Sequence, residues 1–100
     1  MARPRVELQT LLEGITEHVY FQPPENFRME YPCIRYERNG SLNDHADNEL
    51  YRHAKRYQVT VIDRDPDTEL ADVVEALKYS SFERFFPSDD LNHYVFSVYF

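Results

Sequence analysis

Hydrophobic and polar positions alternate most regularly over residues 57–62, and this stretch anchors the predicted fold. Tyr57, Val59 and Val61 fall on one face of an extended chain, and β-branched residues predominate. The opposite face is half polar. The pattern predicts a central strand with one face against a hydrophobic core.

Two other segments repeat hydrophobic residues at helical spacing and predict amphipathic helices over residues 4–13 and 65–78. The hydrophobic stripes of these two helices are Leu8, Leu11, Leu12 and Ile15, and Leu70, Val73, Val74 and Leu77. Asp65 is expected to cap the second helix, with Pro66 at its first position, where a missing N–H costs no hydrogen bond.

Four further segments have the composition or alternation of strands, and they span residues 18–22, 33–38, 80–86 and 92–100. Strict alternation in the third of these places Phe82 and Phe86 on one side and Phe85 on the other. Tight turns between successive strands favour an antiparallel sheet. The order of elements predicts a single α+β domain over residues 1–100. We expect a two-layer sandwich with a mainly antiparallel sheet of about four or five strands and two helices on one face.

The segment 39–50, N-G-S-L-N-D-H-A-D-N-E-L, is too polar to pair as an ordinary strand. Loops of this length in a compact domain are usually functional or disordered. We therefore expect a long loop that projects between the second and third strands. The basic run H-A-K-R follows it at residues 53–56.

Composition narrows the class of protein. The 100 residues carry a formal net charge of -7, which argues against a sequence-independent grip on nucleic acid phosphates. Cys33 is the single cysteine, so the chain can form no internal disulfide and no cysteine-based zinc site. The start M-A-R-P-R lacks the hydrophobic stretch of a signal peptide, and no hydrophobic run reaches membrane-spanning length. We expect a soluble protein made in a reducing cytoplasm.

One possible acid–base site combines His93 with Asp89 and Asp90. A turn with surface carboxylates is the simpler interpretation of these residues. Nucleophile-elbow, Walker and dinucleotide motifs do not occur in the sequence, and its two glycines cannot build a phosphate-binding loop. We expect neither catalytic residues nor a bound cofactor, and we expect no enzymatic activity.

Two clusters of acidic residues suggest metal binding, but neither has the ligand spacing of a known metal site. Alternate carboxylates over residues 63–69 resemble the start of a calcium loop, but Thr68 stands where glycine is needed and Val74 where the bidentate glutamate is needed. Asp44, His45 and Asp47 lie in the polar loop, where a solvated surface is the simpler interpretation. We expect no metal site.

The second face of the predicted sheet carries aromatic residues but has no helix to cover it. Exposed hydrophobic surface and bare strand edges on a small protein usually indicate a partner. The pattern therefore favours an assembly subunit, and a monomer whose helices cover more of the sheet is the alternative.

Four segments carry a family resemblance. They are Y-P-C-I-R-Y-E at 31–37, A-D-N-x-x-Y at 46–51, Y-Q-V-T-V-I-D-x-D-P-D-T-E at 57–69 and F-x-R-F-F-x-x-D-D-L-N-H-Y-V-F-S-V-Y-F at 82–100. In this order they resemble the small tail terminator, or tail completion, proteins of long-tailed bacteriophages, including the tail-to-head joining proteins. The resemblance spans nearly the whole chain, although none of its motifs is chemically diagnostic.

The resemblance implies a structural virion protein that closes into a hexameric ring at the head-proximal end of the tail. Such a ring ends growth of the tail tube and offers a docking face to the head connector or stopper protein. Its partners would be copies of itself, the tube protein and the connector, and genome DNA would pass through an acidic lumen without specific binding. Assembly would take place in the host cytoplasm, without membrane contact.

Five residues are expected to contribute to the assembly interface: Asp44, Asp47, Asn48, Tyr51 and Arg56. The same family neighbourhood includes head-side stopper and tail tube subunits, which remain alternatives. A small metal-dependent enzyme using His93 and an acidic DNA mimic are alternatives from other classes.

Overall fold

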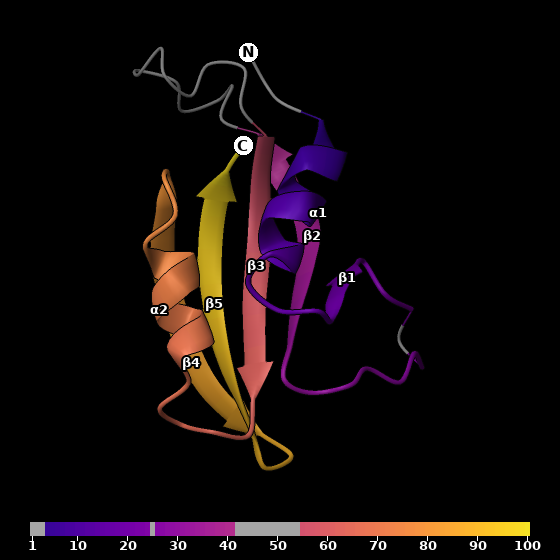
Figure 1. Cartoon of the computed structure of the whole chain (residues 1–100), viewed down its shortest axis with the longest axis vertical. Coiled ribbons are helices and arrows are strands. Elements are labelled where there is room, and N and C mark those ends of the chain that lie inside the picture. The colour runs from indigo at the N-terminus through magenta and orange to yellow at the C-terminus, as the bar shows by residue number, and fades with distance from the viewer. Residues whose placement is uncertain (1–3, 25, 42–54) are drawn as a thin grey trace.

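The computed structural model describes residues 4–24, 26–41 and 55–100. Its elements in chain order are α1 (Arg5–Glu13), β1 (Val19–Phe21), β2 (Cys33–Ser41), β3 (Lys55–Asp63), α2 (Glu69–Glu75), β4 (Ser80–Ser88) and β5 (Leu91–Tyr99) (Figure 1). The strands form one sheet in the order β1-β2-β3-β5-β4. β1 pairs parallel to β2, and the other neighbouring strands pair antiparallel. The predicted α+β class with a mainly antiparallel sheet is confirmed.

β3 is the central strand, as its alternation predicts. It lies between β2 and β5, and its residues Tyr57, Val59 and Val61 are all buried. Val59 lies opposite Tyr36 on β2 and Phe96 on β5, so large side chains from three strands meet at the middle of the sheet. Cross-strand contacts of this kind stabilise a sheet more than any intrinsic strand preference does.

Both helices pack onto this face of the sheet and form one hydrophobic core with it (Figure 1). α1 contributes Leu8 and Leu12, and α2 contributes Ala71 and Val74. Leu11, which belonged to the predicted stripe, is exposed instead. Each short helix thus buries a narrower stripe than its spacing predicts.

α2 begins later than predicted, and its cap is Thr68 rather than Asp65. The Thr68 Oγ1 accepts a hydrogen bond from the Leu70 N–H at 3.3 Å. Asp65 instead accepts a hydrogen bond from the Asp67 N–H at 2.9 Å and closes a separate turn, to which Pro66 belongs. An aspartate side chain that accepts a hydrogen bond from the N–H two residues later forms a turn instead of capping a helix. Asp65 forms such a turn, and α2 therefore begins later in the chain.

Replacement of Thr68 by alanine is expected to lower the free energy of unfolding by about 1 kcal/mol, because an N–H of the first helical turn loses its partner. Asp65→Ala should cost less, since Asp65 does not cap α2. Urea denaturation of both variants measures the two changes, and Thr68→Ser is the control that retains the capping oxygen. A larger loss for Asp65→Ala than for Thr68→Ala would contradict this assignment.

An extra residue in β4 changes which of its phenylalanines share a face. The register against β5 shifts between Phe82 and Arg84, so Glu83 is a bulge residue. Beyond a bulge the alternation of sides is reversed. Phe82 and Phe85 therefore both lie on the face that carries α2, and Phe86 lies on the other. The predicted pairing of Phe82 with Phe86 on one side is wrong for this reason.

The strands that border the predicted loop and the last turn are longer than predicted. β2 continues to Ser41, which pairs with Lys55, so residues 39–41 belong to a strand and not to the loop. Residues 42–54 lie outside the described residues. At the other hairpin β4 continues to Ser88, and Asp89 and Asp90 form the turn with φ angles of 53° and 64°. Two successive positive φ values are typical of a tight hairpin turn.

The face of the sheet opposite the helices has a buried centre and polar surroundings. Cys33, Thr60, Ile62 and Val95 are buried there. Polar contacts surround them, including an Arg35–Glu37 ion pair at 3.2 Å. Met29, from the segment between β1 and β2, lines the same hollow as Thr60 and Ile62. This face therefore combines buried hydrophobic positions with charged ones.

Candidate interaction surface

β4 forms one edge of the sheet and exposes most of its length. In the part of the chain that the structure describes, no strand pairs with the outer side of β4. All of its residues except Ser80 are exposed, and Phe82, Phe85 and Phe86 have relative exposures of 47%, 46% and 38%. A long edge strand with hydrophobic side chains on both faces is a template for pairing with another chain.

Each of the three phenylalanine rings is held on its inner side by an aromatic ring of β5. Phe82 packs edge-on against Phe96 with ring centroids 5.5 Å apart, and Phe85 packs against Tyr94 at 5.0 Å. Phe86 stacks on His93 at 4.6 Å with an angle of 9° between the rings. These contacts fix the rings in place, so the outer hydrophobic surface is preformed.

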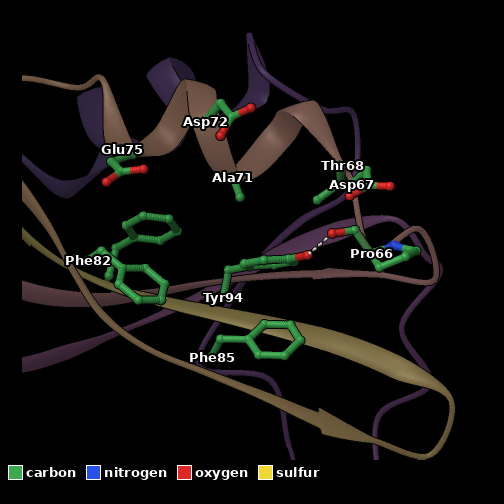
Figure 2. Close-up of a pocket in the computed structure, with 10 residues that line it drawn as sticks. Pro66, Asp67, Thr68, Ala71, Asp72, Glu75, Phe82, Phe85 and Tyr94 are labelled. Carbon is green, nitrogen blue, oxygen red and sulfur yellow. Dashed lines mark hydrogen bonds between the residues drawn. The ribbon is translucent and has the colours of Figure 1, made fainter.

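A groove of about 430 Å³ lies between α2 and the β4–β5 hairpin. Phe82, Phe85 and Tyr94 point into it from the sheet, as Figure 2 shows. Asp72 and Glu75 line it from α2, and the segment that precedes this helix closes one end (Figure 2). The groove thus has an aromatic floor and an acidic rim.

Tyr94 is fixed at the floor of the groove by a hydrogen bond from its hydroxyl to the Pro66 carbonyl (Figure 2). Burial raises the pKa of this hydroxyl above its ordinary value, and the carboxylates of Asp67 and Asp65 raise it further. Both effects favour the neutral phenol, which is the form that donates the hydrogen bond to Pro66.

The candidate acid–base group is not assembled. His93 stacks on Phe86, and its buried Nδ1 has no hydrogen-bond partner among the described residues. Asp89 and Asp90 form the hairpin turn, and neither makes an ion pair with His93. Within residues 4–24, 26–41 and 55–100, no group of three or more histidine, cysteine or carboxylate side chains is arranged to hold a metal ion. Asp44, His45 and Asp47 lie outside the described residues.

Most of the predicted interface residues cannot be placed. Asp44, Asp47, Asn48 and Tyr51 lie outside the described residues. Arg56 lies in β3, where its Nε donates a hydrogen bond to the Asn39 carbonyl at 2.8 Å. That bond joins the start of β3 to the end of β2, so Arg56 holds together the base of the hairpin from which the predicted loop extends. Its part in an interface stays a prediction.

Cys33 is enclosed in the sheet and is not a reactive group. Its side chain is fully buried, and burial raises the pKa of the thiol to about 12. Since the thiolate is the reactive form, this residue acts as a small hydrophobic side chain.

The groove was not predicted from the sequence. Its floor depends on the bulge at Glu83, which brings Phe82 and Phe85 to one face. Its rim depends on the place where α2 starts and on the packing of that helix. One signal was present in the sequence. Phe82 and Phe85 are three residues apart in one strand, so they can lie on the same face only if a bulge lies between them.

Comparisons of this chain with protein-family models, with curated proteins and with solved structures returned no match. Among the helices of the described residues, none combines the length and the hydrophobicity needed to cross a membrane.

Proposed function

We propose that this chain is a ring-forming structural subunit at the head-proximal end of a long-tailed bacteriophage tail, where it ends tube growth and joins tail to head. The resemblance of residues 31–37, 46–51, 57–69 and 82–100 to tail terminator proteins supports this role. Its partners would be further copies of the chain, the tube protein and a head connector or stopper protein.

The observation that carries the proposal is the edge strand β4. This nine-residue strand carries the exposed rings of Phe82, Phe85 and Phe86, and no strand of the described residues pairs with its outer side. Such an exposed edge does not stabilise a monomer, and it makes the monomer prone to aggregation. A neighbouring subunit that covers the edge removes that hazard and buries the Phe86 ring, which lies on the face opposite α2.

Head-to-tail contacts around an axis need two different surfaces on each subunit, and they generate a ring when the rotation closes. β4 would supply one surface. β1 lies at the opposite edge of the same sheet (Figure 1), close to the exposed ring of Phe27, which packs on Tyr20 at 5.2 Å. Contact between these two edges would relate each subunit to the next by the same rotation.

In the proposed subunit the helices and sheet form two layers, and the segment between β2 and β3, predicted as a projecting loop, would reach a neighbour or the tube. Asp44, Asp47, Asn48 and Tyr51 would make contacts from this loop, and Arg56 would hold its base. The net charge of -7 is compatible with a lumen through which DNA passes without binding, because carboxylates repel phosphates.

Electron microscopy of polymerised tail tubes mixed with the purified protein tests the role. We expect a ring at one end of each tube and no further elongation when tube protein is added. Tubes that keep elongating with bare ends would overturn the proposal. A ring that binds the purified head connector and not the tube would instead show a head-side stopper.

A further inference from the structure

We infer that the groove between α2 and the β4–β5 hairpin binds an arginine side chain on a basic segment of a partner protein. The inference concerns the helix-bearing face of the hairpin, not the strand edge that the ring would use, and it does not require the ring to form. Geometry, charge and size each support it.

The floor of the groove offers aromatic faces to a cation. Phe82 and Phe85 are about half exposed, and the Tyr94 ring lies between Phe85 and α2 in Figure 2. A guanidinium group is planar and weakly hydrated, so it stacks on aromatic faces and is attracted by their negative π surface. The rings are held by Phe96 and by each other, so the floor does not need to be ordered on binding.

The rim supplies charge of the opposite sign. Asp67, Asp72 and Glu75 line the groove, and no lysine or arginine among the described residues does. None of these three carboxylates forms an ion pair with another residue in the described parts of the chain. Burial is the largest cause of the raised pKa of Tyr94, and the carboxylate of Asp67 adds to it. Carboxylates at the rim of an aromatic groove favour a cation that can both stack on the rings and pair with a carboxylate.

The size of the groove fits one side chain and its flanking backbone. Its volume of about 430 Å³ falls in the range of roughly 300–1,000 Å³ that is typical of ligand pockets. Nucleic acid is a poor occupant, because its phosphates would meet three carboxylates. A basic polypeptide segment meets both the aromatic floor and the acidic rim with complementary chemistry.

NMR titration of the full chain with acetyl-Gly-Ser-Arg-Ser-Gly-amide tests the inference. We expect saturable shifts at Ala71, Phe82, Phe85 and Tyr94, with millimolar affinity that falls as salt is added. The same peptide with citrulline in place of arginine keeps the shape without the charge, and it should bind about tenfold more weakly. A lysine peptide should bind more weakly than the arginine peptide, since an ammonium cannot stack as a plane.

Variants of the groove sharpen the test. Asp72→Asn combined with Glu75→Gln should weaken binding of the arginine peptide by about tenfold. Glu7→Gln combined with Glu17→Gln removes the same charge from exposed positions outside the groove and should leave binding unchanged. Phe85→Leu should weaken binding several-fold while the chain stays folded, because this ring is about half exposed.

The inference is overturned if arginine and citrulline peptides bind equally, if the shifts map elsewhere, or if the two double variants behave alike. Its failure is distinguishable from failure of the proposed ring. A monomer that binds the arginine peptide supports the groove and counts against the ring. A ring without peptide binding overturns the groove alone.

Discussion

Replacement of Phe96 by alanine is expected to lower the free energy of unfolding by about 3–5 kcal/mol. Phe96 is 1% exposed, and on β5 it lies between Val59 of β3 and Phe82 of β4. Its removal would leave a cavity at the junction of three strands and would take away the partner of the Phe82 ring. Domains of this size are stable by about 5–15 kcal/mol, so the loss is a large share of the total.

Urea denaturation of Phe96→Ala measures this effect, and Phe82→Ala is the matched control. The two phenylalanines face each other across β4 and β5, but Phe82 is 47% exposed. Its truncation should cost about 1–2 kcal/mol, because less surface returns to water. Equal losses for the two variants would show that the core does not extend to β5 as described.

The Phe86→Lys variant is expected to stay folded and to lose self-association. Phe86 lies on the exposed edge strand, on the face opposite the groove, where it stacks on His93 and has the Arg84 guanidinium 5.7 Å from its ring centroid. A lysine at an edge position opposes strand pairing, because its charge cannot be buried against a neighbour. Sedimentation of the concentrated protein should change from a ring to a monomer, while the circular dichroism spectrum is unchanged.

Val6→Lys is the matched control for this variant. Val6 is the most exposed of the large hydrophobic residues described, at 63%, and lies on α1 away from β4. The same change of a hydrophobic residue to lysine should leave the ring intact. Loss of association in Val6→Lys with a normal ring in Phe86→Lys would place the contact on α1 and contradict the role given to β4.

The sequence predicted an element correctly where its local pattern of hydrophobic residues favoured one secondary structure only. The alternation around Val59 predicted the central strand, and the leucines of α1 predicted a helix. Where several local interactions compete, the pattern was ambiguous. Asp63 and Asp65 each accept a hydrogen bond from the backbone N–H two residues later, so that Thr68 and not Asp65 caps α2.

Features that depend on pairing between distant segments could not be predicted in the same way. The bulge at Glu83 is defined only against β5, and it decides which faces Phe82 and Phe86 occupy. The parallel pairing of β1 with β2 brings Val19 opposite Ile34, and no property of either short segment specifies that direction. The groove combines both kinds of feature, since it requires the bulge and the packed position of α2.

In the proposed ring, copies of this chain complete one another along the β4 edge. Native mass spectrometry of the concentrated protein, with and without tail tube protein, measures this association directly. We expect a species of about six times the 12.0 kDa mass of one chain in at least one of these conditions. A species of 12.0 kDa alone in both conditions would contradict the proposed ring.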